Sequence, residues 1–310
     1  MAKTVLRNKR NKIRMTVEDK IYQVVIYTIV TLFTLMCLLP LIYVVGVSLA
    51  SYRELIEKRN FVLIPEHPTI EGYKYVLKQA NFKTGFIVSV ARTLLGVVAA
   101  LTFIIPGGYI LSKYEMPGRK WIMLFFIITM LIGGGTIPAY MLIKSLGLLD
   151  SFWVYIVPAF GGTYNMLIVK IFCEGMPKDI IESADLDGAS EWQKMIFICV
   201  PLLVPTLCAL GLFAAVGHWN SWFDAMLYVK TPAKQPVQYL IQQLFTRTVS
   251  STNMDGAGNA QMMAEELYRA GTDLTVKMAC VVVAMVPILC VYPFLQKYFI
   301  FGMYTGSVKG

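Results

Sequence analysis

The feature that most constrains the fold of this chain is a series of long segments that contain almost no charged residues. The first runs from about Ile21 to Leu49 and holds no Asp, Glu, Lys or Arg. A helix of about 20 apolar residues crosses the roughly 30 Å of hydrocarbon in a bilayer. Because the bilayer interior offers no partners to open backbone groups, each such segment is expected to be a helix. The sequence therefore predicts an all-α integral membrane protein.

Composition supports this prediction, since 56% of the residues are hydrophobic and 15% are charged, whereas soluble domains average about 25% charged residues. The first apolar segment is too long for the core of a signal peptide and lacks a small-residue cleavage site, so we expect a retained anchor. We predict six transmembrane helices in a single domain over residues 21–310. The five further spans are expected at roughly 85–112, 120–143, 152–173, 203–226 and 274–296.

Basic residues predict how the chain is oriented in the membrane. Residues 1–20 form a basic N-terminal region, in which Lys and Arg but no acid occur up to Arg14. Such residues concentrate on the cytoplasmic side, so the N-terminus is expected in the cytoplasm. Six spans then place the C-terminus there too, and the loops 50–84 and 227–273 outside. We attribute the net charge of +9 to juxtamembrane side chains that face anionic lipid, and not to binding of nucleic acid.

Two further expectations concern the cysteines and the last loop. The six cysteines lie mostly inside apolar segments without CxxC spacing, and His67 and His218 are the two histidines. We therefore expect structural thiols and no metal site. The loop 227–273 is rich in small polar residues and is expected to be irregular, with a short helix around 261–269.

A polar island at 174–201 separates two strongly apolar segments. Pro177 suits the first turn of a helix, and the acidic Asp179 favours its positive end. Gly188 is well placed as the left-handed residue that ends this helix. Ser190 and Gln193 then have the spacing of a capping box for a second helix. The island is therefore expected to be a rigid cytoplasmic knob on which another protein can push or pull.

Two acidic residues of the knob are in an unfavourable place. Asp185 and Asp187 fall near the C-terminal end of the first helix, where a negative charge costs roughly 0.3–1 kcal/mol. One interpretation is that water screens both charges and nothing further follows. The other is that a basic groove on a partner protein compensates them. The physics of the residues does not decide between the two.

The third predicted span contains three glycines and a proline near its outer end, within 133–138. Unwound backbone in a membrane requires cover by protein or a watery cavity. The segment is either a simple kink or exit turn, or a break that lines a transport pathway. The second interpretation makes Gly134 and Thr136 candidate pathway residues.

Aromatic and polar residues also gather in the outer part of the fifth span. Tryptophans at such a place belong to an aromatic belt at the membrane interface, or they contact a sugar ring while neighbouring polar groups bind its hydroxyls. Arg92 and Asp224 are charges at or inside span edges, where such groups face protein or a cavity. Mutual pairing and substrate contact both remain open for them. The candidate pathway residues here are Trp219, Asn220, Trp222 and Asp224.

The knob resembles a known sequence motif. Glu182-Ser183-Ala184, then Gly188, Ile198 and Pro201, are similar to the EAA loop of ABC-importer permease subunits, whose usual form is E-A-A-x3-G-x9-I-x-L-P. Ser183 replaces an alanine and Val200 replaces the leucine, with the spacing intact. Residues 219–224 resemble the W-N-x-W-F-D segment of the carbohydrate branch. Residues 292–299 and 306–310 are similar to its C-terminal signature, and 133–138 to its complex-oligosaccharide subgroup.

This resemblance implies a type I ABC importer permease fold in a multi-pass protein of a bacterial cell (inner) membrane. It implies four kinds of partner: membrane lipid, a second and different permease subunit, two ATP-binding subunits, and an extracytoplasmic sugar-binding protein. The EAA loop of the family docks in a groove of the ATPase, which favours compensation of the two acidic residues by a partner. The residues expected to couple to the ATPase are Glu182, Ser183, Ala184, Asp185, Asp187, Gly188, Ile198 and Pro201.

The expected function is import of an oligosaccharide delivered by the binding protein. The sequence contains no GxxxxGK[ST] phosphate loop, so ATP and Mg are expected on the partner subunits, and this chain is expected to be no enzyme and to hold no cofactor. The alternative within the family is a permease for a non-sugar solute. A membrane-embedded enzyme would need converging catalytic groups that the spans do not show, and a channel without ATP coupling would not need the EAA spacing.

Overall fold

The computed structural model describes residues 16–78, 80–251 and 273–293. All the elements in these ranges are helices, which confirms the predicted all-α fold. Four of the described helices are long and apolar enough to cross a membrane, and up to six spans result if each of two bent helix pairs counts as one. The unbent spans are α1 (Val17–Leu49), α4 (Ala80–Ser112), the stretch Glu191–Asn220 that ends with α10 (Val200–Asn220), and the helix Asp273–Pro293.

The two bent pairs correspond to the predicted third and fourth spans. α5 (Arg119–Leu131) and α6 (Thr136–Ser145) meet at 115°, so the segment expected over 120–143 is broken at the glycines where a kink, exit turn or break was predicted. The 3₁₀ turns within Phe152–Gly161 (η1 and η2) meet α7 (Thr163–Glu174) at a gentler 41°. The chain therefore keeps the predicted order of apolar segments but bends two of them.

Glycine and proline explain the sharp bend between α5 and α6. Residues 132–135 are not helical, and three of the four are glycines, the residues with the lowest helix propensity after proline. Pro138 lies in the first turn of α6, where its missing N–H would have no helical partner in any case. Helix therefore ends before the glycines and begins again after them in a new direction.

The fifth span is shifted toward the knob relative to the prediction of 203–226. It starts at Glu191 in α9 (Glu191–Gln193), continues through a π-helical segment, η3 (Lys194–Cys199), and ends at Asn220. A short helix, α11 (Phe223–Tyr228), follows after a break. The wider π turn directly precedes Pro201, whose ring would clash with a carbonyl one turn earlier in a regular helix. The helix can therefore run unbroken from the knob into the membrane segment.

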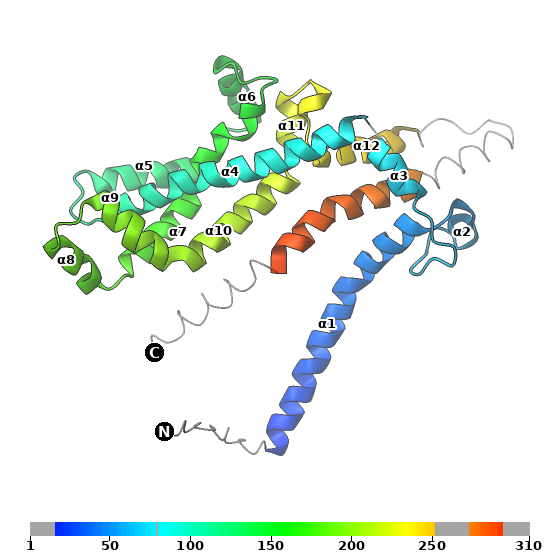
Figure 1. Cartoon of the computed structure of the whole chain (residues 1–310), viewed down its shortest axis with the longest axis horizontal. Helices are drawn as coiled ribbons and strands as arrows, with labels where there is room; N and C mark the ends of the chain where they lie inside the picture. The colour runs from blue at the N-terminus through cyan, green and yellow to red at the C-terminus, as the bar shows by residue number, and fades with distance from the viewer. Residues whose placement is uncertain (1–15, 79, 252–272, 294–310) are drawn as a thin grey trace, which may run out of the picture.

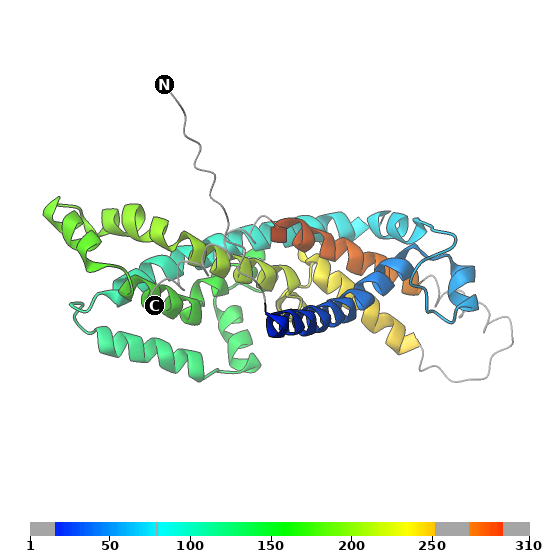
Figure 2. The same cartoon turned by 90° about the horizontal axis from the view of Figure 1, so that it is seen from below.

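Several short helices lie at the two ends of the molecule, whereas α6 and α11 lie between them (Figures 1 and 2). α8 (Lys178–Leu186) lies at one end, whereas α2 (Tyr52–Glu57), α3 (Glu71–Lys78) and α12 (Val237–Ser251) lie at the opposite end. The expectation that 227–273 is irregular is wrong for the part that forms the 15-residue α12. The helix expected around 261–269 lies outside the described residues.

α4 forms the centre of the bundle and packs against both α7 and α10. The main buried cluster joins Ile104 of α4, Met166 and Val169 of α7, and Leu203 of α10. Gly108 allows α7 to approach, because a Cβ there would lie 2.6 Å from Val169 Cγ1. Small residues at such crossings let helix backbones pack closely in membranes. α1, in contrast, buries only residues 46–48, close to its C-terminal end.

Candidate functional site

The polar island forms the predicted knob at one end of the bundle (Figure 1). α8 runs from Lys178 to Leu186, and just beyond it Gly188 takes a left-handed φ of +72°, which glycine adopts without steric cost. Ser190 caps α9, and its backbone N–H donates to the Gln193 side chain at 2.8 Å in a capping box. The helix end at Gly188 and the cap at Ser190 are both confirmed.

Most residues of the EAA-like motif are exposed on this knob. Glu182, Asp187 and Gly188 are exposed, whereas Ala184 is buried and turns inward. Glu182 makes no side-chain hydrogen bond or ion pair with the described residues. The knob therefore presents acidic side chains that are available to another protein. The other motif residues are exposed or half-buried, namely Ser183, Asp185, Ile198 and Pro201.

An open depression of about 320 Å³ lies where α8 ends and the next helix begins. It brings Gly188 and Ile198 to one hollow although they are far apart in the motif. Phe197, which also lines it, is 73% exposed. The lining residues are Asp187, Gly188, Ala189, Gln193, Phe197 and Ile198.

Asp185 is paired inside the chain. The ammonium group of Lys194 donates to the Asp185 carboxylate and also to Glu191 Oε1 at 2.6 Å. Lys194 has a buried side chain, and its charge lies between the two acids. Asp185 is therefore compensated at least in part inside the chain, an arrangement that neither interpretation from the sequence considered, and its coupling role stays a prediction. Asp187 stays exposed.

The same network continues from the knob to α4. Glu191 Oε2 accepts a hydrogen bond from the hydroxyl of Tyr109 at 2.8 Å and pairs with the Lys113 ammonium at 3.0 Å. Tyr109 is buried, and Lys113 follows the end of α4. Networks of charged hydrogen bonds that are fully satisfied stiffen the elements they join. The knob is therefore tied to the central helix as well as to α10.

A second cluster braces the base of α7 beside the knob. Glu174, the last residue of α7, accepts from Arg119 at the start of α5 and from Lys170 at 3.0 Å. Arg119 also donates from Nε to the carbonyl of Leu111 at 2.7 Å. The bases of α4, α5 and α7 are therefore linked by ionic hydrogen bonds. Sequence reasoning did not predict this cluster.

The outer break after α10 is held by Arg92 of α4. The guanidinium donates to both carboxylate oxygens of Asp224, at 2.5 and 3.2 Å, and to the carbonyl of Ser221 at 3.1 Å. It also lies 4.2 Å from the ring centre of Tyr155. Arg92 is 1% exposed. For this pair the structure shows mutual pairing. Arginine favours this geometry, in which two of its N–H groups bind the two oxygens of one carboxylate.

The remaining candidates around the break differ in exposure. Trp219 is 5% exposed, and its indole N–H donates to the carbonyl of Ala284 at 2.9 Å. Trp219 therefore packs as a core residue that joins α10 to the helix Asp273–Pro293. Asn220 is exposed and accepts from Gln238 at 3.3 Å, and Trp222 is half-buried. The polar end of α10 therefore offers Asn220 and Trp222, but not Trp219, on its surface.

The two groups of candidate pathway residues come from neighbouring elements. Tyr140 of α6 stacks on Tyr228 of α11 with ring centres 6.0 Å apart, which places the bent third span beside the outer break. Gly134 and Thr136 are both exposed. The structure therefore places them on the surface of the chain near the break, with no direct contact to Asp224.

Sequence reasoning missed a polar clamp at Asp150 on the same side. Its carboxylate accepts the N–H groups of Lys230 at 3.1 Å and Thr231 at 2.9 Å, and the Thr231 hydroxyl at 2.6 Å. The hydroxyl and the N–H of Thr231 lower the pKa of Asp150 below its ordinary value. Asp150 also has a positive φ of 54°, which aspartate tolerates better than most residues. The clamp joins the loop after α6 to the segment after α11.

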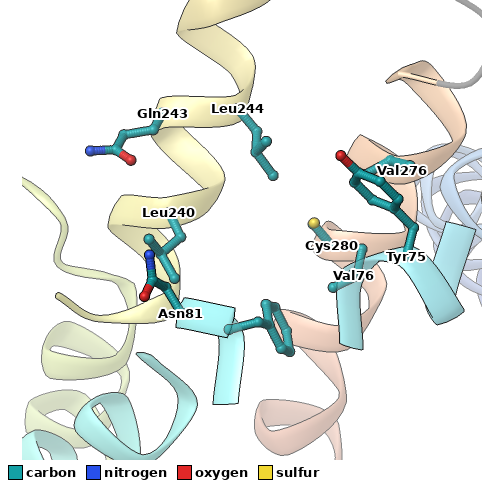
Figure 3. A pocket seen from close by; sticks show the side chains of 9 residues that line it. Tyr75, Val76, Asn81, Leu240, Gln243, Leu244, Val276 and Cys280 are labelled. Atoms are coloured by element: carbon teal, nitrogen blue, oxygen red, sulfur yellow. The ribbon is translucent and has the colours of Figure 1, made fainter. Parts of the chain in front are cut away.

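Two cavities lie at the end of the molecule that carries α3 and α12. The first, of about 140 Å³, is drawn in Figure 3 between α3, α4, α12 and the helix Asp273–Pro293. The second, of about 420 Å³, shares Asn81, Leu240 and Gln243 with the first. Ligand sites measure roughly 300–1,000 Å³, so only the second is large enough. None of the candidate pathway residues lines either cavity.

The described residues contain no group of three or more His, Cys, Asp or Glu side chains that could hold a metal ion. All six cysteines are free thiols in the structure. The functional groups of the candidate sites are therefore exposed acids, paired charges and aromatic side chains. These groups can bind a protein surface or a polar solute.

No protein-family model matches the chain. Individual proteins of known family do match it. It is 35% identical over 293 residues to the polygalacturonan/rhamnogalacturonan transport system permease protein YtcP of Bacillus subtilis (strain 168), which covers 94% of this chain and all of the relative. It is 38% identical over 274 residues to the protein LplC of the same organism, covering 88% of this chain and 90% of the relative.

A solved structure agrees with these relatives. The crystal structure of a bacterial ABC transporter involved in the import of the acidic polysaccharide alginate contains a chain with a TM-score of 0.78 and 29% identity. The match covers 92% of the present chain and 99% of that one. The similarity thus extends over nearly the whole length of both chains. The chain belongs to the family of carbohydrate ABC transporter permeases.

Proposed function

We propose that this chain forms part of the transmembrane pathway for an oligosaccharide in an ATP-driven importer. The names of the relatives support a saccharide cargo, and two of them refer to acidic polysaccharides. Fragments that contain uronic acids are therefore the first substrates to test. A permease for a non-sugar solute remains the alternative, and a panel of solutes distinguishes the two.

ATP is bound and hydrolysed by other subunits in this proposal. The chain carries no phosphate-binding loop, and its exposed acidic knob is suited to a basic groove on such a subunit. Glu182 and Gly188 carry the contact, and Asp187 orients it. The single observation that carries the proposal is the network around Lys194, which joins the knob to α4 and to α10.

The network explains how docking is transmitted. Because Lys194 binds Asp185 of α8 and Glu191 at the start of the fifth span, a push on α8 moves the fifth span with it. Glu191 in turn pulls on Tyr109 and therefore on α4. Two arrangements of these helices, open to opposite sides of the membrane, would then differ in their affinity for the ATP-bound partner.

The saccharide would pass the outer break. Asn220 and Trp222 offer an amide and an aromatic face, the combination that binds sugar hydroxyls and ring faces. Asp224 and Arg92 hold the break in shape, and Trp219 fixes the end of α10 against the helix Asp273–Pro293. Gly134 and Thr136 belong to the neighbouring surface of the proposed pathway.

A second permease subunit completes the pathway in this proposal. The apolar stretch of α1 has none of its residues buried in the chain, so lipid or another subunit covers it. The residues of α5 are likewise not buried. An extracytoplasmic binding protein would deliver the saccharide to the end with α2, α3 and α12. The knob and both termini would then face the cytoplasm of the bacterial cell.

Stimulated ATP hydrolysis by the reconstituted complex tests the proposal. Gly188→Arg puts a large side chain into the depression at a left-handed position, and Glu182→Lys reverses the exposed charge. Both variants are expected to leave the permease in the membrane while lowering saccharide-stimulated hydrolysis at least tenfold. Glu18→Lys is the matched control, since Glu18 is also an exposed acid but lies in the first turn of α1, outside the knob and outside the end with α2, α3 and α12.

The outcomes separate clearly. Loss of stimulation in the two knob variants, with Glu18→Lys unchanged, supports coupling through the knob. Full stimulation in Gly188→Arg would refute it and would move the coupling contact elsewhere on the cytoplasmic side.

A further inference from the structure

Two thiols lie in contact at the base of the knob. Cys173 is in the last turn of α7, and Cys199 ends the π-helical segment, with the two sulfur atoms 3.2 Å apart. The residues between them form the whole knob, including α8. The pair therefore sits where the knob leaves one membrane helix and enters the next.

The surroundings of the two sulfurs hold them close. Cys199 is 0% exposed and Cys173 is 8% exposed. Both pack in the main buried cluster, beside Val169 and Leu203. A disulfide requires a sulfur separation of about 2.05 Å, so closure needs an approach of only about 1 Å. The other four cysteines are not part of this pair and lie elsewhere in the chain, at Cys37, Cys208, Cys280 and Cys290.

We propose that Cys173 and Cys199 form an oxidisable dithiol whose closure staples the base of the knob and slows coupling to ATP hydrolysis. The inference rests on the proposed coupling role of the knob. It names a modification site on that knob, with a disulfide-bearing small thiol compound as the oxidant.

The disulfide forms by two successive thiol–disulfide exchange reactions. The Cys173 sulfur is the more exposed of the two. It gives up its proton as it attacks one sulfur of a low-molecular-weight disulfide, which releases one small thiol and forms a mixed disulfide. The Cys199 sulfur then attacks the Cys173 sulfur and releases the second small thiol. Two protein thiols are oxidised, one reagent disulfide is reduced, and the two protons leave on the released thiols.

The position of Cys199 explains why closure would matter. It belongs to the π-helical segment that connects the knob to α10, and such segments occur often at functional sites because their hydrogen bonding can rearrange. A covalent bond to α7 would hold this segment in one arrangement. The knob could still dock, but the helices that it moves would no longer shift against each other.

The test uses the full transporter complex, reduced and then treated with oxidised glutathione or diamide. Peptide mapping by mass spectrometry is expected to find a Cys173–Cys199 disulfide. Saccharide-stimulated ATP hydrolysis is expected to fall at least fivefold and to return after dithiothreitol. Cys199→Ser should keep its stimulation in the oxidant, whereas the matched variant Cys208→Ser, altered at a half-buried thiol of α10, should lose it as the wild type does.

Two results would overturn the inference. One is the absence of the Cys173–Cys199 disulfide in the wild-type complex under an oxidant that modifies exposed thiols. The other is a cross-linked complex that turns over at the reduced rate. Neither depends on the folding of a variant, and the stimulation of the reduced wild type separately tests the coupling role of the knob.

Discussion

Arg92 of α4 and Asp224 of α11 meet through two hydrogen bonds, of 2.5 and 3.2 Å, although they are far apart in the sequence. The Arg92 side chain is 2% exposed and that of Asp224 is 26% exposed. The pair closes the break between α10 and α11, because Arg92 also holds the carbonyl of Ser221. A charge in this position is tolerated only with its partner in place.

The first prediction concerns this pair. Asp224→Ala leaves the buried guanidinium of Arg92 without its carboxylate, and breaking a buried pair in this way costs about 3 kcal/mol. We expect a clearly lowered unfolding temperature in detergent, measured by tryptophan fluorescence. The double variant Arg92→Met with Asp224→Leu should recover most of the loss, since no unpaired charge remains. A double variant as unstable as Asp224→Ala would contradict the explanation.

The second prediction concerns the centre of the knob network. Lys194→Met keeps the length of the side chain but removes the cation between Asp185 and Glu191. We expect assembly to persist while stimulation of ATP hydrolysis falls by about tenfold, an effect worth roughly 1.4 kcal/mol in coupling. Lys178→Met is the control, because Lys178 is an exposed residue of α8. Equal effects of the two variants would show that only the net charge of the knob matters.

The third prediction tests the packing of α4 on α7. In Gly108→Ala the added Cβ would meet Val169 Cγ1 at 2.6 Å and the backbone nitrogen of Lys170 at 2.9 Å. Because the backbone cannot move away easily, overpacking of about 1–3 kcal/mol is expected. Gly133→Ala is the matched control, since nothing lies within 4 Å of a Cβ at Gly133. Thermal unfolding in the same detergent compares them, and equal stability of both variants would argue against close packing at Gly108.

The fourth prediction follows from the Asp150 clamp. The hydrogen bonds from Thr231 lower the pKa of Asp150 in the folded protein, so the clamp stabilises the fold above the ordinary pKa of aspartate and loses this contribution as the pH falls through the lowered pKa. We expect Asp150→Ala to unfold earlier than wild type at neutral pH. The difference should shrink between about pH 5 and about pH 2. A difference that is constant with pH would assign the loss to backbone geometry at Asp150 instead.

Local sequence signals predicted the parts of the knob that depend on neighbouring residues. The left-handed Gly188 and the capping box of Ser190 need only a few consecutive residues, and both were correct. The pairing of Asp185 with Lys194 was missed, although Glu191 and Lys194 have the spacing of a helical ion pair that could have indicated it. The contact of Glu191 with Tyr109 joins residues from distant segments, and no local pattern indicates such contacts.

The same distinction explains the errors in the membrane spans. Hydropathy located the apolar segments, because the bilayer selects them by length and composition. It could not show that α5 and α6 bend by 115° or that α10 ends at Asn220, since glycine runs and helix ends depend on what covers the freed backbone. Likewise the burial of Trp219 depends on Ala284 in a distant helix. Exposure of a side chain in a bundle is decided by such partners.

The unbroken helix from Glu191 to Asn220 has a mechanical consequence. At 1.5 Å per residue its 30 residues reach about 45 Å, so one continuous helix begins in the knob and ends at the outer break. A movement at the knob would then reach the outer break along one continuous backbone, and no relay of successive side-chain rearrangements would be needed between them.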